Sequence, residues 1–186
     1  MRKRTQKDPG LARLAELIAD AEVAMLTTEE SPAEGPAEGN GTKGTLRSRP
    51  LLTLEMDEEG RLWFFTHLST RKVGEMDQHR TVNLSYADVS RQSFVSISGR
   101  VRMLRDADKA RDLWTQRLKP WFPSGLDDPD LGLLEVTVEE AEYWDVPASR
   151  MQRLFGLTAS GDGEPGQPGE HAQVRPGSPA ESSRPH

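Results

Sequence analysis

Alternation of apolar and polar residues in the middle of the chain predicts β-strands with one buried face. Every second residue is apolar in two segments, 82–86 and 95–103. Side chains on a strand point to opposite faces in turn, so each of these segments presents one face to a core. Residues 62–65, Leu-Trp-Phe-Phe, do not alternate. We therefore expect that strand to lie centrally in its sheet and to be covered on both faces.

Strand-forming residues (Val, Leu, Thr and aromatic side chains) gather in six segments. The expected strands span residues 22–28, 45–56, 61–67, 81–87, 93–105 and 132–145. The acidic turn from Asp57 to Gly60 connects the second strand to the third. Six strands with few helices predict a mainly β fold with short helices, as a barrel or a sandwich.

Three short helices are expected beside these strands. Asp8 as N-cap and Pro9 at the first helical position introduce apolar residues spaced i, i+3, i+4 and i+7, the pattern of an amphipathic helix. Two others are expected at about 70–78, after Ser69 as N-cap, and at about 107–118. Neither is long enough to cross a parallel sheet repeatedly, so we expect no doubly wound α/β fold.

The remaining segments have low complexity. Residues 1–7 form a flexible basic N-terminus, and residues 30–44, which nearly repeat Pro-Ala-Glu-Gly, are expected to be a flexible loop. Residues 158–186 contain no aromatic side chain and are rich in Gly, Pro, Glu and Ser, which predicts a disordered tail. One domain of residues 8–157 is left between the two ends.

Composition narrows the chemistry. The chain has 186 residues, a net charge of −6 and no cysteine, which excludes disulfide scaffolds, thiolate metal sites and cysteine nucleophiles. The histidines lack zinc-helix spacing and no G-x-S-x-G elbow occurs, so we expect no metal site and identify no catalytic side chain. We expect a cytoplasmic protein with no nucleic-acid and no membrane partner, because the charge is acidic and no apolar run could cross a bilayer.

Two basic clusters are candidates for holding an anion. In Ser69-Thr70-Arg71-Lys72, two cations fall in the first turn of an expected helix, where the backbone N–H groups already make the potential positive. A bound phosphate would make this placement favourable. The alternative is a solvated basic turn.

The second cluster is Arg47-Ser48-Arg49-Pro50, within an expected strand. The two-residue period puts Arg47 and Arg49 on one face, where adjacent like charges favour an anion. Pro50 lacks a ladder donor and is restricted to an edge strand, a strand start or a bulge. The alternative is an ordinary edge strand that faces solvent.

Taken in order, these segments resemble the FMN-binding split-barrel family related to pyridoxamine 5′-phosphate oxidase, particularly its general stress protein branch. The resemblance covers about Leu11 to Phe155. The segments that carry it are Leu46-Arg47-Ser48-Arg49-Pro50, Leu62-Trp63-Phe64-Phe65-Thr66, Ser69-Thr70-Arg71-Lys72, Arg91-Gln92 and Ala141-Glu142-Tyr143-Trp144-Asp145. It implies a six-stranded split β-barrel that binds FMN between the subunits of a homodimer.

The resemblance also implies roles for matched residues. Residues 47–50 would line the flavin ring and ribityl chain, and Arg71 and Lys72 would hold the FMN phosphate. Thr66 and Ser69 would supply hydroxyl groups.

Two further matches lie later in the chain. Gln92 would approach the flavin from the second subunit, and Trp144 would be an aromatic residue beside it. Residues 119–123, Lys-Pro-Trp-Phe-Pro, resemble the stress-protein branch; they either cover the flavin pocket or close the bottom of the barrel.

One departure bears on activity. Where the oxidase has an Arg-Leu-His substrate motif, this chain has Arg150-Met151-Gln152, so we expect no true pyridoxamine 5′-phosphate oxidase activity. The leading hypothesis is an FMN-dependent oxidoreductase that acts on an unidentified small redox substrate, with a role in stress response. Two alternatives stay open: a flavin-binding or flavin-sequestering stress protein without turnover, and a β-barrel interaction module without a cofactor.

Overall fold

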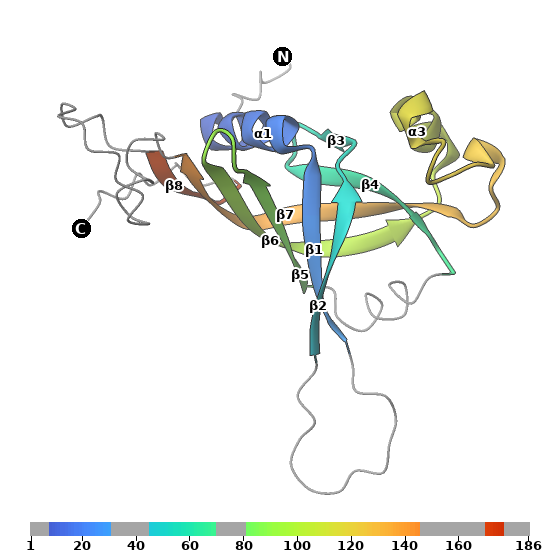
Figure 1. The fold of residues 1–186 in the computed structure, drawn as a ribbon, viewed down its shortest axis with the longest axis horizontal. Coiled ribbons are helices and arrows are strands. Elements are labelled where there is room, and N and C mark those ends of the chain that lie inside the picture. The colour runs from blue at the N-terminus through green and yellow to red at the C-terminus, as the bar shows by residue number, and fades with distance from the viewer. Residues whose placement is uncertain (1–7, 31–44, 70–80, 146–169, 177–186) are drawn as a thin grey trace, which may run out of the picture.

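The computed structural model describes residues 8–30, 45–69, 81–145 and 170–176 of the chain. Eight strands and four short helical segments lie within these residues (Figure 1). In chain order they are α1 (Pro9–Ala21), β1 (Val23–Glu30), β2 (Thr45–Leu52), β3 (Glu55–Met56), β4 (Arg61–His67), β5 (Thr81–Asp88), β6 (Ser93–Leu104), α3 (Ala107–Leu113), η1 (Gln116–Leu118), η2 (Gly125–Asp127), β7 (Leu131–Asp145) and β8 (Glu170–Val174).

The strands form one antiparallel sheet in the order β2-β1-β5-β6-β7-β4-β3, with β8 also paired to β7. β2 and β3 follow each other in the chain but lie at opposite ends of this order. The chain changes its hydrogen-bond partner between these two strands. The N–H of Thr53 donates to Glu22 O, just before β1, whereas the N–H of Leu54 donates to Trp63 O of β4, both at 2.9 Å. β2 and β4 are in contact without a ladder between them, so the curved sheet is a barrel that is open along one side.

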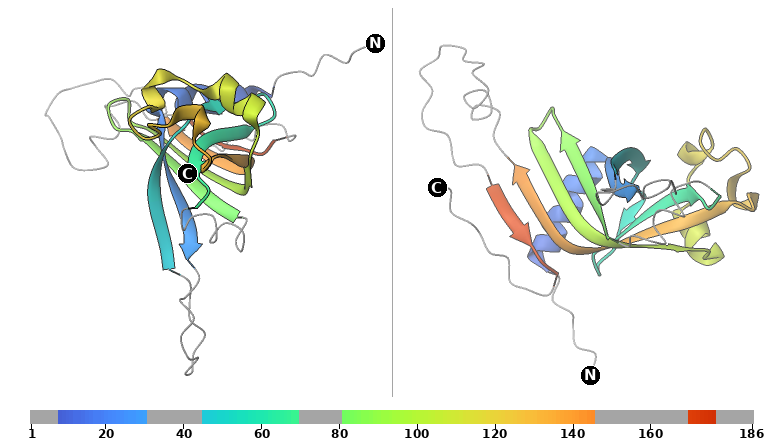
Figure 2. Two further views of the ribbon diagram at one scale, coloured as in Figure 1. Left: turned by 90° about the vertical axis from the view of Figure 1, so that its right-hand side faces the viewer. Right: turned by 90° about the horizontal axis from the view of Figure 1, so that it is seen from below.

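This architecture confirms the prediction of a mainly β fold, but the observed strands differ from the expected ones in the segment 45–56. The single strand expected at 45–56 is two, β2 and β3, because the chain changes partners at Thr53 and Leu54. β7 runs the length of the molecule, with α1 and β8 toward one end and α3 at the other (Figure 1). The turned views in Figure 2 show the strong curvature of the sheet.

The main core fills the inner face of the curved sheet, and α1 packs on it through β5 and β6. The inner-facing residues of 82–86 and 95–101 are buried, as their alternation predicts. Asp8 caps α1 by accepting the N–H of Gly10 at 2.9 Å, and Leu14 and Ile18 of that helix are buried. Local signals in the sequence thus place this helix correctly.

β4 is covered on both faces, which confirms the prediction for residues 62–65. Leu62 and Phe64 belong to the main core, whereas Trp63 and Phe65 point into a second core beneath α3, η1 and η2. Phe65 packs edge-on against Phe122, with ring centroids 5.8 Å apart. The strand has hydrogen-bonded neighbours on both sides, β7 and β3.

The helix expected at 107–118 is shorter than predicted. α3 ends at Leu113, because Trp114 adopts an extended conformation and packs edge-on against Phe65 at 5.7 Å; a 3-10 turn then brings Leu118 into the second core. In the segment 119–123, Phe122 is buried in this core while Trp121 is 64% exposed. Of these two aromatic residues, Phe122 belongs to the second core and Trp121 faces solvent.

The prediction of a disordered tail is wrong for residues 170–174, which form β8 and pair with residues 141–145 of β7. Ala172 and Val174 are buried in the main core, and Val174 packs against Gly10 of α1. Burial against an existing sheet edge and helix supplies the stabilisation that the local sequence lacks. The expected helix at 70–78 and residues 31–44 of the expected loop lie outside the described residues. So do the other expected flexible residues, 1–7, 158–169 and 177–186.

In the described part of the chain, none of the helices is long and apolar enough to span a membrane.

Candidate functional site

The two arginines of β2 lie on one face of an edge strand, as predicted. Arg47 is opposite Thr28 of β1 and Arg49 is opposite Leu26. Leu51, two residues further along the same face, is buried in the main core. Both guanidinium groups therefore lie on the inner side of the sheet, at its open edge.

Arg49 is anchored by a residue that sequence reasoning did not identify. Its Nη1 donates a hydrogen bond to Oγ1 of Thr28 at 3.0 Å. Thr28 is only 2% exposed, and Arg49 is half-buried while Arg47 is exposed. One feature of the sequence could have identified Thr28. It continues the inward face of Ala24 and Leu26, where an apolar residue would be expected.

Ser48 and Pro50 lie on the opposite, outer face of β2. The hydroxyl of Ser48 is 2.7 Å from that of Thr27, and Pro50 is opposite the exposed Met25. A ligand on the inner face can therefore meet the side chains of the two arginines, but only the backbone of Ser48 and Pro50. The edge position of Pro50 is as predicted.

Thr66 is the second-last residue of β4 and lies on the inner side of the sheet, in line with Leu62 and Phe64. It is 2% exposed, and among the described residues its hydroxyl makes one long contact, 3.5 Å to His67 O. Since β2 and β4 are in contact, this buried hydroxyl lies on the strand across the split from Arg49.

Ser69 follows two residues after β4 and is held by Asp130. Its backbone N–H donates to Oδ1 of Asp130 at 2.8 Å, and its hydroxyl donates to Oδ2. The hydrogen bond from the Ser69 side chain is the largest influence on Asp130 and lowers the pKa of its carboxyl. Arg71 and Lys72, the predicted phosphate ligands, lie outside the described residues.

Gln92 and Trp144 form a second group, where β6 begins after its turn from β5 and where β7 ends. In the ladder between β6 and β7, Ser93 pairs with Asp145 and Phe94 pairs with Trp144, so Gln92 and Trp144 lie close together. Trp144 lies four strands from β2 along the sheet and lines a hollow on its outer face, whereas Arg47 and Arg49 lie on the inner face. Within one chain, the predicted residues are therefore divided between two places.

Gln92 has two unusual properties. Its φ of 56° lies in the left-handed region, which is costly for a non-glycine residue. Its side-chain oxygen is buried and accepts no hydrogen bond from any described residue. Strain and an unsatisfied acceptor at one residue are features that occur more often at functional sites than elsewhere.

Trp144 is stacked on His171 of β8, with ring centroids 5.4 Å apart and an angle of 11° between the rings. Nε2 of His171 is 2.7 Å from Oε1 of Glu142, which also lies on β7. Trp144 lines a hollow of about 500 Å³ on the outer face, together with Met25 and Phe94. Sequence patterns did not indicate this partner, because His171 lies in a Gly- and Pro-rich segment.

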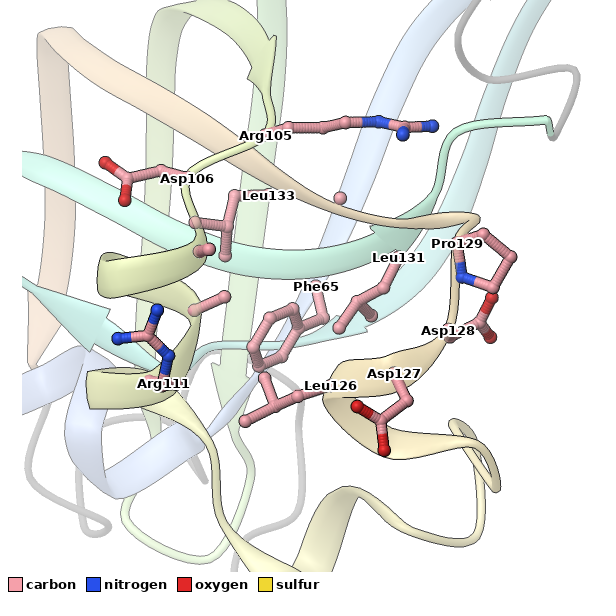
Figure 3. Close-up of a pocket in the computed structure, with 13 residues that line it drawn as sticks. Phe65, Arg105, Asp106, Arg111, Leu126, Asp127, Asp128, Pro129, Leu131 and Leu133 are labelled. Atoms are coloured by element: carbon pink, nitrogen blue, oxygen red, sulfur yellow. The ribbon is translucent and has the colours of Figure 1, made fainter.

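A second hollow of about 430 Å³ opens into the second core, between α3 and residues 126–133 (Figure 3). Phe65, Leu126 and Leu131 form an apolar floor, and the guanidinium of Arg105 points away from it (Figure 3). This hollow lies on the opposite face of β4 from Thr66 and holds none of the predicted site residues.

Comparison with known proteins gives one curated relative, the protein bli-3 of Neurospora crassa, which is 25% identical over 146 residues. The match covers 73% of this chain and spans 65% of the length of that relative.

The fold is shared with solved structures of general stress proteins. A Clostridium acetobutylicum protein related to general stress protein 26 is 23% identical, with a TM-score of 0.60 over 74% of this chain and 89% of that one. The general stress FMN/FAD binding protein of Xanthomonas citri is 24% identical, with a TM-score of 0.57 over 83% of this chain and 96% of that one.

The family model described as pyridoxamine 5′-phosphate oxidase like matches residues 10–162, which include both groups of predicted site residues. The chain belongs to the pyridoxamine 5′-phosphate oxidase-like family.

Proposed function

We propose that this chain binds FMN at the open side of the barrel, between β2 and β4. The observation that carries the proposal is the pair Arg47 and Arg49 on the inner face of an edge strand, with the buried hydroxyl of Thr66 across the split. Two adjacent cations favour an anion between them. Family membership and the FMN/FAD-binding description of the Xanthomonas citri protein support a flavin as that anion.

The described residues fit the demands of FMN. Its phosphate accepts hydrogen bonds and needs cations and N–H or O–H donors, which Arg47, Arg49 and Thr66 provide. Its planar ring needs a surface where backbone groups can approach, and β2 has a ladder partner on one side only. Arg71 and Lys72 complete the proposed phosphate site.

We also propose that two copies of the chain form the site together. Within one chain Trp144 faces the outer side of the sheet and the two arginines of β2 face the inner side, but a second copy could bring its own Gln92 and Trp144 to the opening of the first. The buried, unsatisfied oxygen of Gln92 would then gain a donor, provided its side chain turns. A homodimer is therefore part of the proposal.

The flavin, when bound, supplies hydride or single-electron chemistry, and the chain supplies binding, orientation and exclusion of water. No acid or base of the protein is needed for that. The proposed activity is oxidation or reduction of a small molecule, and the alternative is flavin binding without turnover. The general stress names of the relatives support a role in stress response, and they do so equally for the enzyme and for the non-catalytic flavin binder.

The test is a fluorescence-quenching titration of the purified chain with FMN, with Arg49→Gln as the variant. Loss of a charge-assisted hydrogen bond should weaken binding about tenfold to a hundredfold. Arg100→Gln is the matched control, because Arg100 is an exposed arginine of β6 that pairs with Glu139 at 2.6 Å. Equal affinity for all three proteins would contradict the proposed site.

Two further measurements separate the parts of the proposal. Arg71→Glu should abolish FMN binding but leave riboflavin, which has no phosphate, almost unaffected. Sedimentation with FMN should give a species of twice the 20.7 kDa chain mass. Reduction by NAD(P)H followed by rapid reoxidation would favour the enzyme over the non-catalytic binder.

A further inference from the structure

A carboxylate stands where the proposed function requires a positive potential. Asp130 contacts the turn that leads from β4 into the proposed phosphate-binding residues. A negative charge close to a phosphate weakens binding of that phosphate, so the charge of Asp130 by itself would oppose FMN binding. Its hydrogen bonds offer a different explanation.

Asp130 holds the turn at three points. Its carbonyl oxygen accepts the N–H of Leu68 at 2.9 Å, Oδ1 accepts the N–H of Ser69 at 2.8 Å, and Oδ2 accepts the hydroxyl of Ser69. Asp130 is itself fixed, because its N–H donates to Oδ1 of Asp128 at 2.9 Å. These bonds begin where the ladder between β4 and β7 ends, at the pair His67–Leu131.

Packing fixes the same turn from its other side. The side chain of Leu68 lies directly on Gly132, where a Cβ would come within 2.3 Å of Leu68 Cδ2. Any larger residue at 132 would force the Leu68 side chain to move. The turn that leaves β4 is therefore held by the hydrogen bonds of Asp130 and packed against Gly132.

The bonds also determine what Ser69 can do. A phosphate only accepts hydrogen bonds, and both donors of Ser69, its N–H and its hydroxyl, already point to Asp130. Ser69 cannot donate to a phosphate while this pair is intact.

We propose that Asp130 is a positioning residue for FMN binding, with Ser69 as its anchor point and not as a phosphate ligand. This inference rests on the proposed function. The pair fixes the turn at Leu68 and Ser69, so FMN binding does not have to supply the entropy cost of ordering that turn. The hydrogen bonds from Ser69 and the nearby charge of Arg105 favour the ionised carboxylate, and this cation limits its repulsion of the ligand.

The experiment is a double-mutant cycle on FMN affinity. Asp130→Ala, which removes both side-chain hydrogen bonds to Ser69, should weaken FMN binding about tenfold, and Ser69→Ala, which removes only the hydroxyl bond, should weaken it less. The double variant should bind FMN no more weakly than Asp130→Ala alone, because it removes no further interaction. Riboflavin affinity should change less than twofold. Additive losses would show that Ser69 binds the phosphate directly and would overturn the assignment.

Asp130→Asn separates geometry from charge. An asparagine can accept the Ser69 N–H through its oxygen and donate to the Ser69 oxygen through its amide, so it should retain or improve FMN affinity. Asp127→Ala, which removes a nearby exposed carboxylate that does not contact Ser69, is the control for net charge. Weakening by Asn as large as that by Ala would overturn the positional role.

Hydrogen exchange tests the anchor without any ligand. The Ser69 amide should be protected in the wild-type chain and should exchange at least tenfold faster in Asp130→Ala. If the wild-type chain fails to bind FMN, the proposed function is wrong, whereas unchanged Ser69 exchange in Asp130→Ala would overturn the anchor itself. The two failures are therefore distinguishable.

Discussion

Asp57 connects the turn between β3 and β4 to the second core, and Asp57→Asn should destabilise the fold strongly for so small a change. Its Oδ1 accepts the N–H groups of Glu59 and Arg61, both at 3.0 Å. Its Oδ2 accepts Nε of Arg61 at 2.8 Å and the indole Nε1 of Trp63 at 3.1 Å. Whichever way an asparagine amide turns, its NH₂ group faces two donors.

The magnitude follows from the burial of the two side-chain donors. Trp63 is 5% exposed, and a buried N–H without an acceptor costs about 1–3 kcal/mol. The Arg61 side chain is 37% exposed, so loss of its ion pair adds no more than about 1 kcal/mol. We expect a loss of about 2–3 kcal/mol, or a fall of about 1 M in the urea midpoint.

The difference should depend on pH. Burial on its own raises the pKa of Asp57, but hydrogen bonds from the Arg61 backbone, Trp63 and the Arg61 side chain outweigh it, and the pKa lies below the ordinary value of 3.8. A carboxyl with a lowered folded pKa stabilises the fold above its unfolded pKa and loses that contribution as the pH falls through the folded value. The gap between wild type and Asp57→Asn should be full at pH 7 and shrink below about pH 4.

Urea unfolding followed by tryptophan fluorescence at pH 7 and pH 3 measures both effects. Glu59→Gln, which alters only an exposed ion pair with Arg61, should cost less than about 1 kcal/mol. In a Trp63→Phe background the asparagine penalty should fall by about half, because the indole N–H is gone. A penalty under about 0.5 kcal/mol for Asp57→Asn at pH 7 would refute the reasoning.

Three other substitutions test the fold. Gly99→Ala should lower the free energy of unfolding by about 1–3 kcal/mol or more, because its Cβ would lie 2.5 Å from the carbonyl oxygen of Thr137. An unchanged melting temperature would mean that β6 and β7 can move apart there without loss of stability. Val174→Ala should cost about 2 kcal/mol, since the side chain is 2% exposed, and a neutral result in urea unfolding would argue against β8. Asp8→Ala should cost about 1 kcal/mol through loss of the α1 cap, measured by the same method; no loss would mean that another group satisfies the Gly10 N–H.

Local patterns determined much of the fold before any tertiary contact was known. The cap at Asp8, the inward faces of β5 and β6, and the double burial of residues 62–65 follow from patterns within a few neighbouring residues. The arginine pair of the candidate site is of the same kind, because a strand period of two is enough to put Arg47 and Arg49 on one face. Each of these properties depends only on neighbours in the sequence.

Tertiary structure decided which elements meet. No pattern within 45–56 shows that the chain leaves β1 and joins β4 at Thr53 and Leu54, since ladder partners are chosen by long-range closure of the sheet. β8 forms in a sequence with weak strand signals because β7 and α1 already offer it a covered edge. The contacts Thr28–Arg49 and Ser69–Asp130 join residues 21 and 61 positions apart, and the geometry that brings them together exists only once the barrel has closed.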